Sequence, residues 1–449
     1  MQFTPHTAED IERALAAIGI DSLEELFTDI PSELLDPPFD LPAGMDEVSL
    51  RRHLQELAAK NRTDGPNFLG GGTARHFLPA VTEHLAAQGA FVTAYTPYQP
   101  EVSQGILQAT FEYQTMMAEL TGLAVSNASM YDGASAVAEA ALLAMRATRR
   151  NRVVVCTGVH PQSREVLQTY LTPLEAKLEQ LPLDPLLTPT PTLSKETACL
   201  IVQNPNFLGY LEDMPRLAAA AHRVGALFIA VVDPLSLALL VPPGSYGADV
   251  AVGDGQTLGN PLNFGGPAFG FMTVTKPLLR QLPGRLVGQT IDRDGNRAFV
   301  LTLQAREQHI RRSKARSNIC SNHQLTALMA TINLAALGPT GLVEVATASI
   351  KAAHKLATRL AETGIRVVRD ARFFNEFVIE LSGDPQAFRR QLAEQGIHAG
   401  VPVPAEYALG PAVLLAATEL TTNEEIEALV TASSRLEHND SSLGGKRGF

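Results

Sequence analysis

The chain has 449 residues, 45% of them apolar and 18% charged, and its formal net charge is −11 at pH 7. This length exceeds what a single core supports, so we expect a globular protein with two or three domains and a large buried core. The negative charge argues against nucleic acid or an anionic membrane surface as the main partner, because both bind clustered lysine and arginine.

The cysteines and the N-terminus indicate the cellular compartment. Three cysteines without metal-ligand spacing are scattered along the chain, at Cys156, Cys199 and Cys320. This usage fits a reducing compartment better than a disulfide framework, and it indicates no metal site. The N-terminus lacks the basic and apolar regions of a signal peptide, and Asp and Pro interrupt the longest apolar stretches. We therefore expect a cytoplasmic protein that does not span a membrane.

The first segment, residues 1–62, is predicted to be a helical arm. Thr7 and Asp10 have the spacing of a capping box, and apolar residues then repeat on one helical face, at Ile11, Leu15 and Ile18. Four prolines between positions 31 and 42 divide the segment into pieces too short to form a domain. We expect the apolar stripe of this arm to be an interface.

Residues 63–325 alternate short apolar runs with helical spacers. The strand-like runs are residues 153–156, 198–203, 227–232, 249–253 and 269–274. This alternation predicts a large α/β domain with a mostly parallel, doubly wound sheet that is covered on both faces. In such sheets ligands gather at the carboxyl ends of the strands.

The rest of the chain is predicted to form a smaller unit. A helix is expected from about residue 322 to residue 337, ended by Gly338 and Pro339. Residues 326–436 then form a smaller α/β domain, with strands near residues 366, 377 and 413. Residues 437–449 are expected to be a flexible tail because they are polar and rich in glycine.

The segment from Ala226 to Gly270 carries the clearest chemical pattern. An apolar strand ends in Asp233, a second strand follows, and a loop rich in Gly, Asn and Pro then contains Gln256. This is the layout of a pyridoxal-phosphate site, where the aspartate keeps the pyridinium nitrogen protonated and a lysine after the next strand forms the Schiff base. A carboxamide cannot condense with an aldehyde, because its nitrogen lone pair is delocalised. Covalent cofactor chemistry therefore cannot start at Gln256.

Two other interpretations of this segment stay open. Strands ending in aspartate and glycine-rich loops are common in α/β proteins, so the pattern also fits ordinary structure. Alternatively, another lysine forms the Schiff base in a self-sufficient enzyme. Lys276 follows the next strand and Lys314 lies in a basic run, but neither comes directly after the strand that carries the aspartate.

Two more segments carry polar candidates. His160 follows the predicted strand at 153–156, so it can share a crevice with Asp233 and stack on a flat ring. The proline-stiffened loop 93–105 offers side chains for a pocket wall, namely Tyr95, Tyr98, Gln99, Glu101, Ser103 and Gln104. A plain surface histidine and an ordinary capping loop are the alternatives.

Two motifs are candidates for binding an anion. The run 304–320 is strongly basic and includes His309, Arg311 and Arg312, whose guanidinium groups suit a carboxylate or phosphate. A solvated helix face is the usual meaning of such a run. The glycine-rich turn at residues 68–73 is a weaker candidate for approaching a phosphate, because it lacks a phosphate-loop signature.

Four long segments together resemble the glycine cleavage P-protein family, glycine dehydrogenase (decarboxylating), and most closely its N-terminal half: YTPYQPEVSQG, FEYQTMMAELTGL, GDGQTLGNPLNFGGP and AREQHIRRSKARSNIC. The resemblance covers nearly the whole chain. It implies a fold-type I pyridoxal-phosphate-dependent transferase fold, in which two homologous halves pair like the protomers of a dimer. It also implies that a separate subunit 2 carries the Schiff-base lysine and the pyridoxal phosphate, so that this chain holds no covalent cofactor.

For this chain the resemblance implies a subunit without the lysine. Gln256 falls on the lysine position, and His160 and Asp233 are remnants of a duplicated cofactor site. Together with subunit 2, the chain is expected to decarboxylate glycine and to pass the aminomethyl group to the lipoyl arm of H-protein, with T-protein and L-protein in the wider system. The loop from Tyr95 to Gln104 and the residues around His309 are expected to form walls of a shared site. A pseudoenzyme scaffold that assembles or regulates the complex is the alternative.

Overall fold

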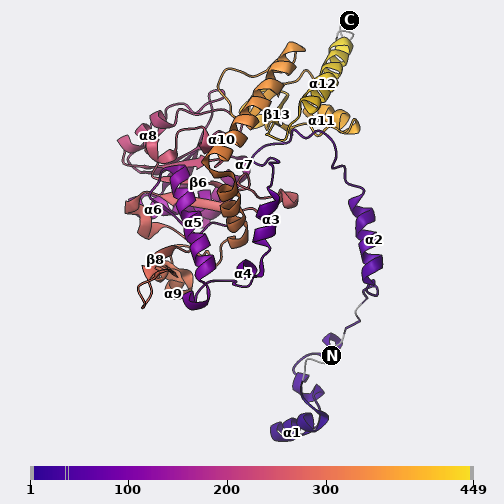
Figure 1. The fold of residues 1–449 in the computed structure, drawn as a ribbon, viewed down its shortest axis with the longest axis vertical. Helices are drawn as coiled ribbons and strands as arrows, with labels where there is room; N and C mark the ends of the chain where they lie inside the picture. The colour runs from indigo at the N-terminus through magenta and orange to yellow at the C-terminus, as the bar shows by residue number, and fades with distance from the viewer. Residues whose placement is uncertain (1–4, 36, 39, 445–449) are drawn as a thin grey trace. The chain divides into compact units, whose positions relative to one another are not determined.

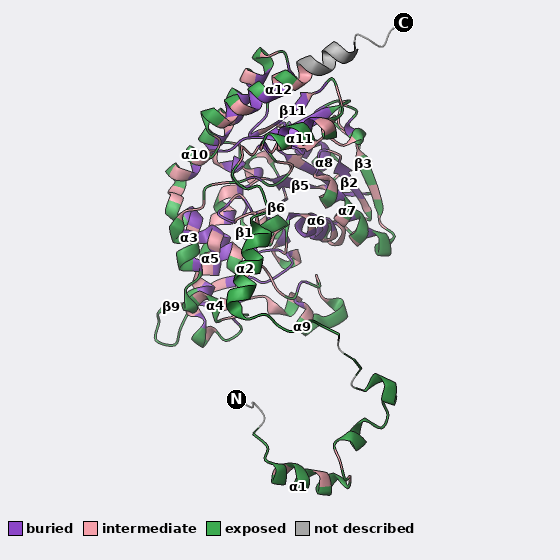
Figure 2. Cartoon of the chain, turned by 90° about the vertical axis from the view of Figure 1, so that its right-hand side faces the viewer, coloured by how far each residue is buried: buried purple, intermediate pink, exposed green. Residues whose placement is uncertain are grey.

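The structure is a computed structural model that describes residues 5–35, 37–38 and 40–444, with side chains described as far as residue 437. The chain divides into two compact units, residues 1–63 and residues 64–449 (Figure 1). The first unit contains α1 (Ala8–Ile18) and α2 (Glu47–Ala58), and neither helix has a buried residue (Figure 2). The predicted capping box is present, because Asp10 N donates to Thr7 Oγ1 at 3.2 Å and Thr7 N donates to Asp10 Oδ2 at 3.0 Å.

The second unit is built on a seven-stranded sheet in the order β1-β7-β6-β5-β4-β2-β3. Its strands are β1 (Val125–Ser126), β2 (Arg152–Cys156), β3 (Lys177–Leu181), β4 (Thr197–Asn204), β5 (Leu227–Val232), β6 (Val250–Asp254) and β7 (Gly270–Val274). Strands β2 to β6 run parallel to one another, and β7 pairs antiparallel with both β6 and β1. The expected mostly parallel sheet is therefore confirmed.

Helices cover both faces of this sheet. On one face α6 (Gly133–Thr148) and α7 (Pro161–Leu171) pack against Val153 and Val155, whereas on the other face α5 (Gln104–Thr121) and α8 (Met214–Arg223) share a core with Val154 and Cys156. Successive strand residues point to opposite faces, so each continuous apolar strand contributes side chains to the core on both faces of the sheet. Shorter elements complete this part, namely α3 (Ala80–Ala86), α4 (Gly89–Val92), α9 (Gln308–Arg311) and the hairpin of β8 (Val287–Ile291) and β9 (Arg297–Leu301).

A four-stranded antiparallel sheet lies in the C-terminal part of the same unit. Its order is β10-β11-β13-β12, with β10 (Arg366–Val367), β11 (Glu376–Glu380), β12 (Val401–Pro402) and β13 (Ala412–Ala416). A separate hydrophobic core joins it to residues of three helices, α10 (Gln324–Glu362), α11 (Pro385–Glu394) and α12 (Asn423–Gly444). The sequence places the boundary between the two domains at residues 325 and 326, and this boundary stays a prediction.

The course of α10 and α12 differs from the sequence expectation. Gly338 has φ 61° and ψ −179°, so the helix is interrupted at the predicted position, but a second helical segment continues directly to Glu362. Pro339 explains this, because proline suits the first turn of a new helix. By length and composition alone α10 is apolar enough to cross a bilayer, yet its residues belong to two cores of the unit. The helix α12 extends to Gly444, over part of the expected flexible tail, and residues 445–449 lie outside the described residues.

Candidate functional site

A cavity of about 440 Å³ lies where β2, β4, β5 and β6 end. It is lined by His160, Asp233 and Gln256, together with Gly71, Gly72 and Thr73 of the glycine-rich turn. Parallel strands deliver their C-terminal loops to one edge of the sheet, which is why residues far apart in the sequence meet here. The cavity therefore unites the three residues that the sequence assigns to a remnant cofactor site.

His160 uses both of its ring nitrogens within the chain. Its Nδ1 accepts a hydrogen bond from Gln162 N at 3.2 Å, and its Nε2 lies 2.8 Å from Gly71 O. Because Nδ1 accepts, Nε2 carries the proton and donates to the carbonyl. Burial lowers the pKa of His160, which favours this neutral form. The ring also meets Phe207 edge-on, with centroids 5.1 Å apart.

Asp233 is held at the carboxyl end of β5. Its Oδ1 accepts from Thr257 Oγ1 at 2.8 Å and from Leu235 N at 3.0 Å. Burial raises the pKa of Asp233, although the bond from Thr257 acts in the opposite direction. The carboxyl group is thus fixed in a poorly hydrated wall, where an ionised form requires a cationic or hydrogen-bonding partner.

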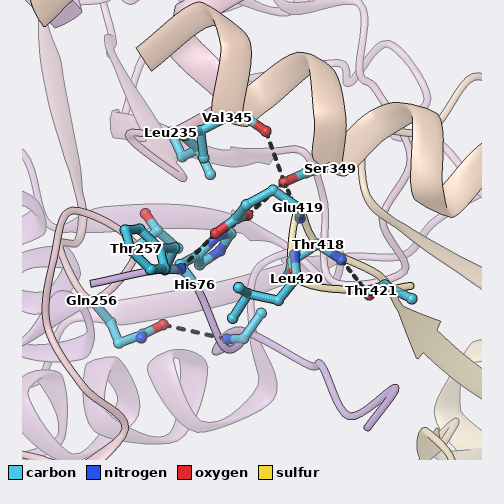
Figure 3. Close-up of polar contacts among 12 residues, drawn as sticks. His76, Leu235, Gln256, Thr257, Val345, Ser349, Thr418, Glu419, Leu420 and Thr421 are labelled. Carbon is cyan, nitrogen blue, oxygen red and sulfur yellow. Dashed lines mark hydrogen bonds and ion pairs between the residues drawn. The ribbon is translucent and has the colours of Figure 1, made fainter. Parts of the chain in front are cut away.

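Gln256 ties two loops together. It is only 4% exposed, its Oε1 accepts from Ala74 N at 3.3 Å, and its Nε2 donates to Asn260 O at 2.9 Å. Figure 3 shows the Oε1 contact to the segment after the glycine-rich turn. A carboxamide supplies both the donor and the acceptor that this bridge needs, whereas an ammonium group supplies donors only.

The glycine-rich turn is bound to a carboxyl group of the small sheet. Gly71 N donates to Glu376 Oε1 at 2.7 Å, and a Cβ at Gly70 would lie 2.1 Å from the same oxygen. Burial, with a smaller contribution from the nearby charge of Asp233, raises the pKa of Glu376 to about 7. The Gly71 amide already binds an acidic side chain, and the expectation that this turn approaches a phosphate stays a prediction.

The N-terminus of α6 also lies at the cavity, and helix N-termini are natural anion sites. Here, however, carboxyl groups of the chain bind the first amides. Asp132 Oδ1 accepts from Ser135 N at 2.7 Å, and Asp254 Oδ2 accepts from Gly133 N at 3.1 Å. Burial raises the pKa of Asp254 as well. An incoming phosphate would meet two acidic side chains at the place where it needs free donors.

A phosphorylated aldehyde cofactor does not fit this cavity. Such a cofactor needs a primary amine for the Schiff base, and its phosphate needs donors or cations. The described residues that line the cavity include no lysine and no arginine, and they include four acids, at Asp132, Asp233, Asp254 and Glu376. This cavity is therefore not a working pyridoxal-phosphate site.

A buried polar network supports one edge of the cavity (Figure 3). His76 Nδ1 lies 2.8 Å from Glu419 Oε2, and Ser349 Oγ donates to the same oxygen at 3.0 Å. His76 also lines the cavity, and its Nε2 is buried without a hydrogen-bond partner in the described part of the chain. The network joins the segment after the glycine-rich turn to α10 and to the loop after β13.

The other two candidate segments meet each other and do not line the cavity. The rings of Tyr98 and His309 pack edge to face with centroids 5.6 Å apart, and the Arg285 guanidinium lies 5.6 Å from the centroid of the Tyr98 ring. Tyr95 Oη is 3.2 Å from Ser321 Oγ. We call the residues gathered here the cationic patch, namely Tyr95, Tyr98, Arg285, His309, Arg311 and Arg312.

The remaining predicted wall residues differ in solvent exposure and in hydrogen bonding. Gln99, Glu101, Arg311 and Arg312 are exposed, and Ser103 is buried. Gln104 braces the β8–β9 hairpin, because its side chain donates to Phe299 O and accepts from Phe299 N, both at 2.9 Å. Arg312 has φ 52° and ψ −127°, a conformation that favours glycine and costs on the order of 1–3 kcal/mol in other residues. The two arginines therefore sit on an exposed and strained segment.

Several residues of these sites escaped sequence reasoning. Asp254 stands at the carboxyl end of β6, so the rule that identifies Asp233 would have identified it too. Glu376 is a carboxyl group at the start of an apolar strand, which is a weaker signal. The sequence around Arg285 contains no motif that predicts a role for it. Its position depends on hydrogen bonds to residues distant in the sequence, to Cys320 O and to Asn322 Oδ1.

Comparison with known proteins assigns the family. Residues 1–432 match the sequence profile of the glycine cleavage system P-protein. The chain belongs to the glycine cleavage P-protein family. A relative from Moorella thermoacetica, named probable glycine dehydrogenase (decarboxylating) subunit 1, is 51% identical over 96% of this chain and 99% of its own length. A relative of the same name from Geobacillus kaustophilus is 46% identical over 96% and 98%.

Solved structures confirm the fold. A crystal structure of glycine decarboxylase (P-protein) of the glycine cleavage system, in inhibitor-bound form, is 56% identical and superimposes with a TM-score of 0.90 over 97% of this chain and 100% of that chain. Glutamate decarboxylase from Lactobacillus brevis is 13% identical with a TM-score of 0.68 over 90% and 95%, and so shares the fold alone. The expected fold-type I pyridoxal-phosphate-dependent transferase fold is therefore confirmed for this P-protein chain.

Proposed function

We propose that this chain is the lysine-free subunit of a two-subunit glycine cleavage P-protein in the cytoplasm. Its partner, subunit 2, carries the Schiff-base lysine and the pyridoxal phosphate. The assembly decarboxylates glycine and transfers the aminomethyl group to the lipoyl arm of H-protein, and T-protein and L-protein act with it in the wider system. The relatives named subunit 1 support the existence of a second subunit.

The observation that carries this proposal is the bonding of Gln256. Its buried carboxamide stands at the Schiff-base lysine position of the fold and bridges Ala74 and Asn260. Carboxyl groups also close the N-terminus of α6, where a cofactor phosphate would need free amides. Both features support the proposal that the partner carries the covalent chemistry. They leave His160 and Asp233 as remnants of a cofactor site in this chain.

The contribution of this chain to the reaction lies in the cationic patch. Active sites of this fold are built at subunit interfaces, so exposed side chains of one subunit complete the site of the other. Arg311 and Arg312 suit a carboxylate or phosphate, and Tyr95 and Tyr98 supply phenolic donors beside them. Gln99, Glu101, Ser103 and Gln104 of the same segment complete this wall of the shared site.

The alternative enzyme that uses Lys276 has no structural support. Lys276 starts a short helical turn after β7, and it is not among the residues that line the cavity. A scaffold that never touches the reaction needs no exposed arginines on strained backbone. The cationic patch therefore favours the shared site over the scaffold.

Reconstitution tests the proposal. Glycine decarboxylation onto lipoylated H-protein is measured with this chain alone, with subunit 2 alone and with both, and with pyridoxal phosphate supplied throughout. We expect activity only in the mixture. Activity of this chain alone would contradict the role given to Gln256, and full activity of subunit 2 alone would leave this chain a scaffold.

A further inference from the structure

A buried carboxyl group on α6 belongs neither to the lining of the cavity nor to the cationic patch. Glu139 is only 4% exposed, and it stands beside fully buried residues of the same helix, Ala138 and Ala140. Burying a carboxyl group is unfavourable unless it receives hydrogen bonds. Ser317 Oγ donates to Glu139 Oε1 at 2.7 Å, whereas Oε2 is buried without a hydrogen-bond partner in the described part of the chain. The bond to Ser317 is therefore what this carboxyl group provides.

Ser317 fixes one end of a loop. It directly follows residues 307–316, which we call the basic segment and which carry two arginines of the cationic patch. Arg306 precedes the segment, and its guanidinium group donates to backbone carbonyl oxygens at 3.0 and 3.1 Å. Arg316 N donates to Arg306 O at 3.2 Å, so the two ends of the segment meet. The hydroxyl of Ser317 then ties this closure to α6.

The basic segment holds a strained conformation between these ends. Arg312 has φ 52° and ψ −127°, which a residue other than glycine keeps only where the surrounding structure fixes it. Inside the segment the backbone bonds are local, because Arg311 N donates to Glu307 O at 2.9 Å and Ala315 N donates to Arg312 O at 3.0 Å. The restraint therefore depends on the two ends of the segment, together with the ring contact of His309.

We propose that Glu139 is a positioning residue for the cationic patch. Its carboxyl group binds Ser317 and so holds the C-terminal end of the basic segment, which keeps Arg311 and Arg312 in place. Glu139 does not touch the reacting groups and acts through Ser317. The anchoring concerns residues of this chain alone, whereas its importance for turnover rests on the proposed function.

Proteolysis of the full-length chain tests the anchoring without subunit 2. Under native conditions trypsin cleaves after Arg311 or Arg312 when the basic segment opens, and mass spectrometry measures the rate. We expect Ser317→Ala and Glu139→Ala each to accelerate this cleavage at least about fivefold, because each removes the hydrogen bond between the segment and α6. Glu139→Gln keeps an acceptor for the Ser317 hydroxyl and should be cleaved at close to the unaltered rate.

Two controls separate anchoring from general stability. Thr169→Ala removes an exposed hydroxyl that binds within α7, to Glu165 O at 3.0 Å, and should leave cleavage of the basic segment unchanged. Cleavage after Arg359 in α10 should be unchanged in every variant. Unchanged cleavage of the basic segment in both alanine variants would overturn the proposal. Equal acceleration after Arg359 would overturn it too, because that result would show general unfolding.

Reconstitution with subunit 2 tests the effect on the reaction. Sedimentation measures the amount of assembled complex, so that turnover is expressed per complex and a loss of folded chain does not lower it. We expect Ser317→Ala and Glu139→Ala to lower turnover per complex at least about fivefold, and Glu139→Gln to restore it. Normal turnover in both alanine variants would overturn the positioning role. An inactive mixture of the unaltered chains would contradict the proposed function, whereas proteolysis would still decide the anchoring.

Discussion

At the scale of single residues, the polar side chains that line the cavity form hydrogen bonds with one another and with the backbone around them. Gln256 bridges two loops, His160 binds Gly71, and Glu376 binds the amide of the same glycine. Each group would have to be released before the cavity received a phosphorylated ligand. These hydrogen bonds therefore oppose the binding of a phosphorylated ligand in the cavity.

Glu376 gives stability a defined pH dependence. Its pKa is raised from 4.5 to about 7, so the folded state holds the proton more tightly than the unfolded state does. The favourable contribution of Glu376 to the free energy of unfolding is complete below pH 4.5. It is lost as the pH rises through about 7, a change on the order of 3 kcal/mol. We expect Glu376→Gln to match the unaltered chain at pH 4.5 and to be more stable at pH 8. Urea unfolding at both pH values measures this, and an equal difference at the two would refute the assignment.

A lysine at position 256 should not give this chain cofactor binding. In Gln256→Lys the ammonium group cannot accept from Ala74 N, which leaves a buried amide unpaired and costs about 1–3 kcal/mol. The carboxyl groups of Asp132 and Asp254 still occupy the first amides of α6. We expect the variant to be less stable and to show no absorbance of bound pyridoxal phosphate. A stable yellow chain would show that the lysine alone was missing.

At the scale of elements, strand ends position the cavity and a braced hairpin positions the cationic patch. Four parallel strands end at the cavity, so it depends on the sheet itself. The patch instead depends on cross-links, because Gln104 holds β9 and Arg285 holds the loop before α10. The patch is therefore the easier of the two to alter without unfolding the chain.

Removing charge from the patch should impair catalysis more than folding. Arg311→Ala and Arg312→Ala each delete an exposed guanidinium that makes no ion pair among the described residues. We expect turnover of the reconstituted complex to fall at least about tenfold for each, the loss of one charge-assisted hydrogen bond to a reacting group. Arg293→Ala, on the exposed β8–β9 turn, is the control and should keep normal turnover. Normal turnover in both patch variants would remove the arginines from the site.

Much of the sheet could be predicted from the sequence because its strands are short, apolar and separated by helical spacers. The runs at 153–156 and 227–232 fall within β2 and β5. His160 and Asp233 follow the carboxyl ends of these strands, where ligands bind in such sheets, so both could be predicted as cavity residues. The pairing of Glu376 with the glycine-rich turn could not be predicted, since it joins residues 305 positions apart. The contact of Tyr98 with Arg285 and His309 could not be predicted either, because these residues are also far apart in the sequence.

At the scale of the whole molecule, the N-terminal unit exposes many apolar side chains. Its helices bury no residue, and it exposes large apolar side chains, including Ile18, Leu34, Leu41 and Val48. Full burial of each such side chain is worth about 1.5–3 kcal/mol, so a partner surface that covered the arm would stabilise the assembly. The sequence expectation of an interface here stays a prediction.

Deleting the arm should separate folding from assembly. We expect a chain of residues 64–449 to keep the circular dichroism and melting temperature of its own compact unit, and to bind subunit 2 at least about tenfold more weakly. Sedimentation of each mixture measures assembly. Ile18→Ser with Leu41→Ser in the full chain is the matched variant and should show the same defect in milder form. Unimpaired assembly of both would place the interface elsewhere.

The central claim is that the cofactor is bound covalently by the partner and not by this chain. The most direct measurement is to mix the two subunits with pyridoxal phosphate, reduce with borohydride and determine by mass spectrometry which chain carries the pyridoxyl group. We predict one label per copy of subunit 2 and no stoichiometric label on this chain. A stoichiometric label on any lysine of this chain, Lys276 included, would contradict the account.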